Sequence, residues 1–282
     1  MTGVLAVTGS TGALGRLVAR ALSERGLQQR LLVRDPARAP ELPGAVVERT
    51  SYADPDLARA SLAGVGTLFM VSGAEAADRL EQHRTFVDAA AAAGVQHVVY
   101  TSFAGAAPDC TFTLGRDHWA TEEHLRATGM AFTFLRDSLY LDFMPDLVGE
   151  DGVIRGPAGD GRVAAVTRAD IARSTVAVLT DPAAHAGLTW DLTGPEALSL
   201  DQVAAILTAH TGRTVTYHAE TVEEAYESRL RWPAPQWQYD AWVSTYTAIA
   251  NGELAGVTDH VERLTGRAPT GLAAYLADRD GS

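Results

Sequence analysis

The sequence predicts an α/β fold, in which a doubly wound parallel sheet is followed by a smaller α+β lobe. The N-terminus reads as a buried strand, a glycine-rich turn and an amphipathic helix, in that order. Short apolar strands then alternate with helical segments as far as Leu135, which is the order of a Rossmann-type sheet with right-handed crossovers. Beyond Leu135 the alternation loosens and aromatic residues become frequent, as expected of an appended lobe.

The glycine-rich turn is the strongest local signal. Val4–Val7 is an apolar run with the length of a buried strand, and Gly9, Gly12 and Gly15 follow at G-x-x-G-x-x-G spacing. Glycines allow a tight turn and a close approach to a pyrophosphate, whose charge the N–H groups at the start of the next helix can hold. The unit therefore predicts a dinucleotide-binding site. The alternative is a turn that only reverses the chain.

The residues after the second strand, Arg30–Val33, predict which dinucleotide is bound. In this fold the end of that strand meets the adenosine ribose, where an acid would bind a free 2′-hydroxyl. Here Arg34 comes first and Arg38 follows four residues later, which suits a 2′-phosphate, while Asp35 could cap the next turn. The sequence favours NADPH over NADH. Otherwise Arg34 is a solvated loop residue.

The third and fourth strands, Val46–Val47 and Thr67–Val71, continue the sheet. The fourth strand ends in Ser72 and Gly73, and a covering helix follows over Ala76–Ala93. The ends of such strands lie at the carboxyl edge of the sheet, so Ser72 and Gly73 are expected beside the nicotinamide half of the cofactor.

The fifth and sixth strands complete the alternation. Val95–Tyr100 is followed by Thr101, Ser102 and Phe103, a loop over Ala104–Gly115 and a helix over Arg116–Thr128; the sixth strand is Met130–Leu135. We expect residues 1–148 to form the dinucleotide-binding core, with segments around 163–193 returning to it. Residues 149–282 are expected to form mainly the smaller substrate lobe, with helices over Leu200–Thr208 and Val222–Leu230 and a mostly helical, aromatic-rich end.

Composition excludes several classes of chemistry. The sequence has no lysine, so a P-loop lysine, a Schiff base and the Tyr-x-x-x-Lys pair of ordinary short-chain dehydrogenases are all ruled out. A net charge of −12 opposes binding to nucleic acid. The histidines show no metal-ligand spacing, so no metal is expected.

The expected compartment is the cytoplasm. The single cysteine, Cys110, excludes an internal disulfide, fits a reducing environment and is expected to be an incidental thiol on a polar loop. No apolar run approaches ~18 residues, and the first one is too short for a signal peptide. We therefore expect no membrane association.

A candidate proton-relay pair lies on the helix that follows the fifth strand. His118 and Glu122 are four residues apart and share one helix face. A carboxylate beside the histidine would orient it and raise its pKa, which would make it a proton donor near neutral pH. The alternative is an ordinary surface pair. His124, on the same helix, is expected to face solvent.

Aromatic residues predict an apolar substrate cleft. Phe103, Tyr140 and Phe143 follow sheet strands, and Trp232 and Trp237 come from the C-terminal lobe. A flat aromatic substrate above the nicotinamide would explain them together, although each could equally be core. A hydrolase is not expected, because there is no G-x-S-x-G motif and Ser102 has no evident histidine partner.

Six segments, taken in order, resemble the NmrA-like group of atypical short-chain dehydrogenases, and within it the type 2 NADPH:quinone oxidoreductases and triphenylmethane reductases. They are V-T-G-S-T-G-A-L-G, L-V-R-D-P, Y-T-S-F, H-W-A-T-E, F-L-R-D-S-L-Y and V-T-R-A-D-I-A. The resemblance spans essentially the whole chain. It implies a Rossmann core, a small substrate lobe, NADPH without flavin, and reduction of quinones or dye-like aromatics.

The resemblance also implies roles for single residues. The dinucleotide would be held by Gly9, Ser10, Thr11, Gly12, Ala13, Leu14, Gly15 and Arg34 and flanked by Ser72 and Gly73. Thr101, Ser102 and Phe103 would lie near the nicotinamide, and His118, Glu122 and Tyr140 would face the substrate. Two positions depart from the family pattern: Asp137 stands where relatives usually have Asn, and Thr50-Ser51 where they often have Gly-Asp.

The main hypothesis is an NADPH-dependent reductase that transfers hydride to a quinone or an electron-poor aromatic. A quinone also needs a proton, from His118 or water, so His118→Ala is expected to slow quinone reduction more than it weakens NADPH binding. The rival is a non-catalytic redox sensor that binds the dinucleotide and regulates a partner. A biosynthetic reductase or isomerase and a homodimeric assembly stay open.

Overall fold

The structure is a computed structural model in which residues 3–280 are described. The chain divides into two compact units, and each is assembled from three segments. Unit 1 comprises Met1–Phe103, Asp117–Arg136 and Arg168–Trp190; unit 2 comprises Ala104–Arg116, Asp137–Thr167 and Asp191–Ser282. The chain therefore passes from unit 1 to unit 2 three times.

Unit 1 is built on a seven-stranded sheet of order β3-β2-β1-β4-β5-β6-β9. The strands are β1 Val4–Thr8, β2 Gln29–Val33, β3 Ala45–Arg49, β4 Val65–Met70, β5 His97–Phe103, β6 Ala131–Asp137 and β9 Thr189–Leu192. The pairs from β3 to β5 are all parallel, with Ala6 opposite Arg30 and Leu68 opposite Val98. The strand order reverses between β1 and β4, which is where such sheets bind ligands. The predicted doubly wound sheet is confirmed.

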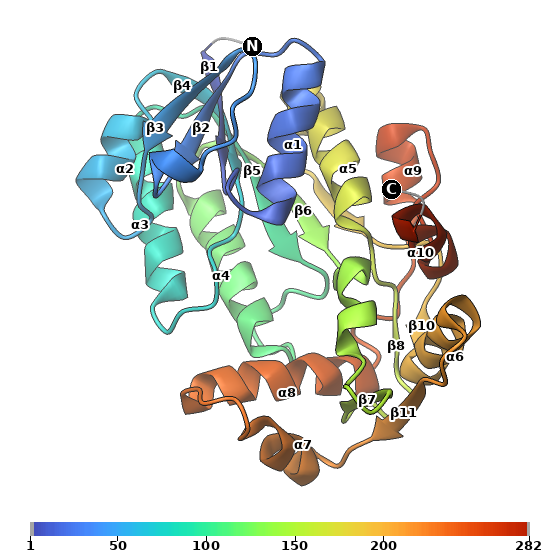
Figure 1. Ribbon diagram of the computed structural model, residues 1–282. Coiled ribbons are helices and arrows are strands. Elements are labelled where there is room, and N and C mark those ends of the chain that lie inside the picture. Colours follow the sequence, from blue (N-terminus) through green and yellow to red (C-terminus); the bar gives the residue numbers. More distant parts are fainter. Residues whose placement is uncertain (1–2, 281–282) are drawn as a thin grey trace. The chain divides into compact units, whose positions relative to one another are not determined.

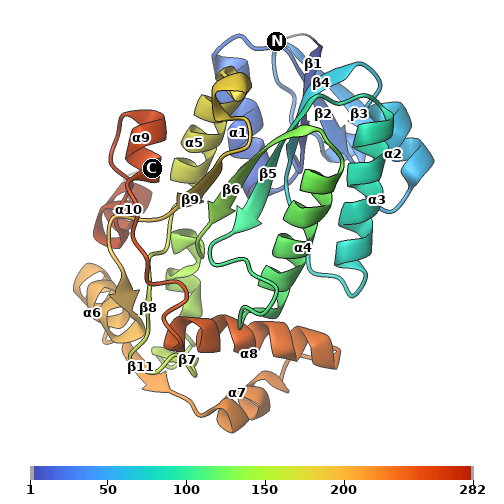
Figure 2. The same ribbon diagram turned by 180° about the vertical axis from the view of Figure 1, so that it is seen from behind.

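Helices cover both faces of this sheet. On one face lie α1 Ala13–Glu24 and α5 Arg168–Thr180, which pack against each other. The other face is covered by α2 Pro55–Ser61, α3 Arg79–Ala92 and α4 Thr113–Ala127, as the two opposite views agree (Figures 1 and 2). The buried residues of α1, among them Val18 and Leu22, recur at helical spacing, as the sequence predicted.

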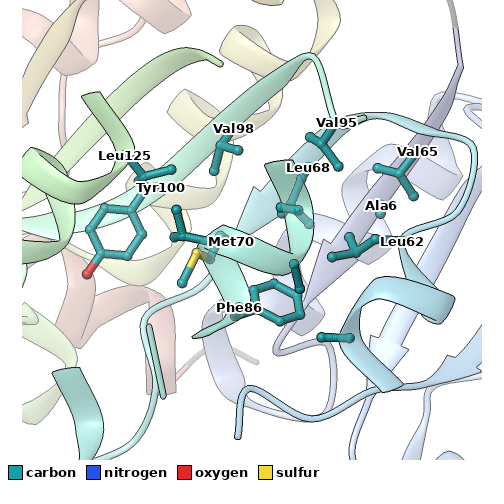
Figure 3. Packing of buried hydrophobic residues seen from close by; sticks show 14 of the residues in the cluster. Ala6, Leu62, Val65, Leu68, Met70, Phe86, Val95, Val98, Tyr100 and Leu125 are labelled. Carbon is teal, nitrogen blue, oxygen red and sulfur yellow. The ribbon is translucent and has the colours of Figure 1, made fainter. Parts of the chain in front are cut away.

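A hydrophobic cluster of unit 1 joins strands β1, β2, β4, β5 and β6 to helices α2, α3 and α4. Figure 3 shows Leu68 and Met70 of β4 beside Phe86 of α3, with Tyr100 of β5 at one end of the cluster. Each of these side chains is fully buried. The hydroxyl of Tyr100 therefore needs partners inside the protein, and these belong to the site described below.

Several predicted boundaries were wrong by two or three residues. Strand β5 continues through Phe103, because Thr101 and Ser102 are buried and hydrogen-bonded within the fold. Helix α4 begins at Thr113 rather than Arg116, and β6 continues to Asp137. In both strands, buried polar residues at the end, Thr101 and Ser102 in β5 and Asp137 in β6, extend a strand that apolar content alone had ended early.

Unit 2 contains most of the remaining helices and two small sheets. The helices are α6 Leu200–Thr211, α7 Val222–Arg229, α8 Gln236–Ala250, α9 His260–Thr265 and α10 Leu272–Asp280. Strands β8 Arg162–Val163 and β10 Leu198–Ser199 pair antiparallel, and β7 Val153–Gly156 and β11 Thr216–Ala219 pair parallel. Capping boxes at Ser199 and Thr221 begin α6 and α7. This content is the predicted α+β lobe. Within residues 3–280, every helix is too short or too polar to span a membrane.

Candidate active site

The glycine turn after β1 requires glycine for definite steric reasons. Gly9 has a φ of +67°, a conformation that side chains rarely adopt, and its carbonyl accepts a hydrogen bond from the Gly12 N–H at 2.8 Å. A Cβ on Gly15 would lie 2.3 Å from the Gly9 carbonyl oxygen. Helix α1 can therefore pack directly on the turn only because residue 15 is glycine.

The same turn fits the pyrophosphate of a dinucleotide. Helix α1 has Gly12 as its N-cap and so lacks a side-chain cap, and its first turn carries no acidic residue. The Oγ of Ser10 is fully buried and has no hydrogen-bond partner among residues 3–280. Unpaired N–H groups and an unpartnered hydroxyl beside a positive helix end suit an anionic ligand. Thr11, Ala13 and Leu14 complete this segment.

The end of β2 presents cations rather than an acid. The Oδ1 of Asp35 accepts a hydrogen bond from the Ala37 N–H at 3.1 Å and so caps the short 3₁₀ helix Pro36–Arg38. Arg34 and Arg38 are exposed. Because the acid is engaged in the turn and the guanidinium groups are accessible, this edge suits a 2′-phosphate.

Strands β4 and β5 are tied together where they end. The Ser72 N–H donates to Thr101 Oγ1 at 2.7 Å, and the Gly73 N–H donates to His83 Nε2 at 2.8 Å. The ring of Phe103 lies 6.0 Å from that of His118 between centroids. The structure thus gathers Ser72, Gly73, Thr101, Phe103 and His118 within unit 1.

The hydrogen bonds of His118 define its protonation state. Arg79 Nη2 lies 2.9 Å from His118 Nε2, and a guanidinium only donates, so Nε2 is the acceptor and carries no proton. Nδ1 then holds the proton and donates to the Tyr100 hydroxyl at 3.0 Å. Burial and the nearby Arg79 charge hold the pKa of His118 well below its ordinary value. His118 is a buried, neutral imidazole.

The predicted pairing of His118 with Glu122 is wrong. Glu122 is fully buried, and its carboxylate accepts hydrogen bonds from Ser102 Oγ at 2.6 Å and from Arg136 Nε and Nη2 at 2.8 and 2.7 Å. Arg126 adds a longer contact at 3.4 Å. Glu122 therefore ties α4 to β5 and β6 instead of orienting His118. The expected rise in the pKa of His118 is also wrong, because its neighbour is a cation.

Sequence reasoning missed Arg79, His83 and Tyr100. His83 accepts from Gly73 at Nε2, so its Nδ1 carries the proton and faces Thr121 Oγ1 at 2.9 Å. Burial lowers the pKa of His83 to about 3. No motif could have marked this network, because its members come from α3, β5 and α4, which are far apart in sequence.

Unit 2 contains a cavity of about 620 Å³ with aromatic walls. Of the predicted substrate residues, Tyr140, Phe143 and Trp232 line it, and Phe103 belongs to unit 1. The rings of Tyr140 and Phe143 are stacked with centroids 6.0 Å apart, and Phe143 and Trp232 are each 49% exposed. Tyr246 also lines the cavity, a contribution that the sequence did not reveal. Trp237 is not among the described residues that line it.

Asp137 is a buried acid with few partners. Its side chain is 2% exposed, and Oδ1 has no hydrogen-bond partner among residues 3–280. The Tyr140 hydroxyl donates to Oδ2 at 3.5 Å. Burial raises the pKa of Asp137 well above its ordinary value, against a smaller opposing effect of that hydrogen bond. The sequence marked Asp137 as a departure from the family pattern but not as a buried acid.

Two further expectations are settled by side-chain positions. Cys110 lies in a loop and is buried; its Sγ donates to the Phe112 carbonyl at 3.3 Å, and burial raises the pKa of the thiol. His124 is partly exposed and bonds Asp88 at 2.7 Å. Within residues 3–280 no three His, Cys, Asp or Glu side chains are grouped as metal ligands would be.

Comparison with known proteins identifies the family. The model of the NmrA-like family matches residues 1–251. The chain belongs to this family. An NAD(P)H azoreductase from Xenophilus azovorans is 34% identical over 277 residues, which are 96% of this chain and 96% of the relative. Quinone oxidoreductase 2 of Escherichia coli K12 is 33% identical over 282 residues, with 97% and 98% covered.

Solved structures of two similar enzymes agree with this assignment. The E. coli NADPH-dependent quinone oxidoreductase in complex with NADPH superimposes with a TM-score of 0.90 at 32% identity, covering 98% of this chain and 100% of that one. Triphenylmethane reductase from Citrobacter sp. with NADP(H) gives 0.87 at 31% identity, covering 97% and 99%. Nmra, a negative transcriptional regulator, shares only the fold, at 17% identity and a TM-score of 0.77. The predicted family and enzyme class, an NAD(P)H-dependent oxidoreductase, are confirmed.

Proposed function

We propose that this NmrA-like protein uses NADPH to reduce quinones and dye-like, electron-poor aromatic compounds without a flavin. The aromatic cavity of unit 2 carries the proposal, because stacked rings and a volume of about 620 Å³ suit a flat aromatic acceptor. The names of the relatives, an azoreductase, a quinone oxidoreductase and a triphenylmethane reductase, point to the same class of acceptor.

Unit 1 is assigned the cofactor. The turn Gly9–Gly15 holds the pyrophosphate, Arg34 binds the 2′-phosphate, and Ser72, Gly73, Thr101 and Ser102 flank the nicotinamide half. NADPH, when bound, supplies a hydride. The residues around it contribute positioning and exclusion of water more than covalent chemistry.

Unit 2 is assigned the acceptor. Tyr140 and Phe143 provide stacked ring surface, and Trp232 provides a further exposed ring beneath the Arg231 guanidinium, which lies 4.0 Å from its centroid. Since the chain has no lysine, it lacks the Tyr-Lys pair that ordinary ketone reduction uses. Ketones are therefore expected to be poor substrates compared with quinones and dyes.

His118 is proposed to position neighbouring groups. Its two ring nitrogens are occupied by Arg79 and Tyr100, and it is neutral, so it has no proton to release at Nε2. Glu122 is proposed to have a structural role, because its hydrogen bonds hold α4 against β5 and β6. Neither residue is assigned proton transfer to the acceptor.

The test is NADPH oxidation by purified protein with a panel of quinones, azo dyes and cationic triphenylmethane dyes, with NADH in parallel. Turnover with NADPH by the full-length protein supports the proposal if the preparation shows no flavin absorbance. Tight NADPH binding without turnover on any acceptor would instead favour a redox sensor. Equal use of NADH would overturn the role of Arg34, which Arg34→Ala tests directly against the exposed control Arg59→Ala.

A further inference from the structure

The proposed acceptors differ in their need for a proton. A cationic triphenylmethane dye becomes neutral on accepting a hydride and needs nothing more. A quinone must gain a hydride and one proton to become a hydroquinone. The site therefore needs a proton source for one class of acceptor, and the neutral, doubly hydrogen-bonded His118 does not provide it.

Asp137 is the acid best suited to that task. It is the last residue of β6 and the first of the unit 2 segment Asp137–Thr167, and its backbone carbonyl accepts from the Ala104 N–H at 2.9 Å, so its position is fixed. Its carboxyl is buried, no ion pair holds it as a carboxylate, and Oδ1 has no partner among the described residues. A buried carboxyl without a cation is most stable as the neutral acid, which has a proton to give.

Tyr140 connects this acid to the cavity. Its ring lines the cavity beside Phe143, and its hydroxyl is within 3.5 Å of Asp137 Oδ2. A distance at the outer limit of hydrogen bonding is common before substrate binds, and such contacts shorten in the loaded enzyme. The hydroxyl can accept one proton and donate another, as a relay requires.

We propose that Asp137 is the proton source for quinone reduction and that Tyr140 relays the proton to the acceptor oxygen. The proposal rests on the proposed function. The Tyr140 O–H bond breaks as an O–H bond forms on the quinone, and the tyrosine oxygen takes the proton of Asp137, which becomes a carboxylate. The hydride supplies two electrons and one hydrogen, the relay supplies one proton, and NADPH is oxidised to NADP⁺. Water reprotonates Asp137 through Tyr140 after the product leaves.

The decisive experiment compares two acceptors in one enzyme. Single-turnover rates of NADPH oxidation are measured at neutral pH with a benzoquinone and with a cationic triphenylmethane dye, for wild type, Asp137→Asn and the control Asp160→Asn. Asp160 is an exposed acid of unit 2 that does not line the cavity. Loss of a general acid costs about 10²-fold or more. We expect Asp137→Asn to lower the quinone-to-dye rate ratio at least tenfold, and Asp160→Asn to leave the ratio unchanged.

Other outcomes separate the two proposals. If none of the acceptors supports NADPH oxidation by the wild-type protein, the proposed function fails. If wild type reduces quinone and dye but Asp137→Asn lowers both equally, Asp137 is structural and the inference alone is overturned. If the dye is not a substrate, the pH profile decides. The wild-type quinone rate should fall as pH rises through the pKa of Asp137, whose facing titratable group is Tyr140, and this fall should be absent in Asp137→Asn.

Tyr140→Phe provides a second variant should Asp137→Asn fold poorly. It keeps the ring in the cavity wall and removes only the hydroxyl that joins Asp137 to the acceptor. We expect it to lower the quinone-to-dye ratio by a factor similar to that of Asp137→Asn. A ratio equal to wild type would overturn the relay.

Discussion

Glu122 of unit 1 and Asp137 of unit 2 are both buried carboxyl groups, and their partners are of opposite kinds. In unit 1, Glu122 is enclosed by hydrogen bonds from Ser102 and by the paired guanidinium nitrogens of Arg136. In unit 2, Asp137 has only the distant Tyr140 hydroxyl on one oxygen, and its other oxygen has no partner among residues 3–280. Burial is nearly the same for both residues. The partners differ.

This difference separates a structural acid from a reactive one. A carboxylate bound by two nitrogens of one arginine is immobile, because any movement would break the contacts that it makes. A buried carboxyl without a cation is instead favoured in its neutral form and can release a proton when a substrate demands one. Four variants test this comparison.

The largest effect is expected for Glu122→Gln. The amide cannot balance the charge of Arg136, which remains opposite it in a mostly buried position. Breaking one side of a buried ion pair costs on the order of 3 kcal/mol in the free energy of unfolding. Chemical denaturation should measure that loss.

Glu123→Gln is the matched control. This neighbouring acid is 48% exposed and pairs with Arg126 at the surface, so its loss should cost less than about 1 kcal/mol. If the two variants lose equal stability, Glu122 does not hold the elements of unit 1 together and the contrast with Asp137 disappears.

Gly15→Ala should produce the next largest effect, and it should act on cofactor binding. The new Cβ would lie 2.3 Å from the Gly9 carbonyl oxygen, so α1 must move away from the turn. Overpacking of this kind costs about 1–3 kcal/mol, which corresponds to a rise in the Kd for NADPH of roughly fivefold to 100-fold or more. Calorimetric titration measures it.

The control for this variant is Gly256→Ala, in unit 2, where a Cβ would meet no atom within 4 Å. It should bind NADPH as wild type does. Equal weakening by both variants would mean that the turn after β1 does not hold the cofactor, and the division of roles between the units would need revision.

The fold could be predicted from the sequence to the extent that local patterns encode it. The glycine turn over Gly9–Gly15 and the apolar strand Val4–Val7 mark their own structure, and the strand–helix alternation follows from spacing. The ends of elements were less predictable. Strand β5 runs through Thr101 and Ser102 because of hydrogen bonds to residues far away in the chain, and no local pattern records those partners.

The candidate site shows the same limit more sharply. His118 and Glu122 share a helix face, so spacing suggested that they pair. In the fold, each finds a stronger partner on another element, Arg79 for His118 and Arg136 for Glu122. Competition among long-range partners decides such pairs, and helical spacing carries no information about it. The cavity residues Tyr140 and Phe143 were found because they follow a strand end closely.

Asp137→Asn should raise stability modestly, and more at high pH. The folded protein holds the pKa of Asp137 above its unfolded value, so this group's stabilising contribution is complete below the unfolded pKa and is lost as pH rises through the folded pKa. The amide cannot ionise and avoids that loss. The gain in Tm over wild type should therefore be larger near pH 8 than near pH 5. Each kcal/mol of difference in the free energy of unfolding should shift Tm by about 2–4 °C. A gain that is equal at both pH values would show that Asp137 is not a neutral acid in the fold.

The smallest effect is expected for His118→Ala on the quinone-to-dye rate ratio. The substitution removes two hydrogen bonds, the one that Arg79 donates and the one that Tyr100 accepts, which are worth about 2 and about 1 kcal/mol. Both rates should fall by a few-fold together, since positioning serves either acceptor, and the ratio should change less than about twofold. His124→Ala, on the exposed side of the same helix, is the control. Loss of a proton donor slows only the reduction of the acceptor that needs a proton, whereas loss of a positioning residue slows both reactions. A tenfold fall of the ratio in His118→Ala would therefore identify His118, and not Asp137, as the proton donor.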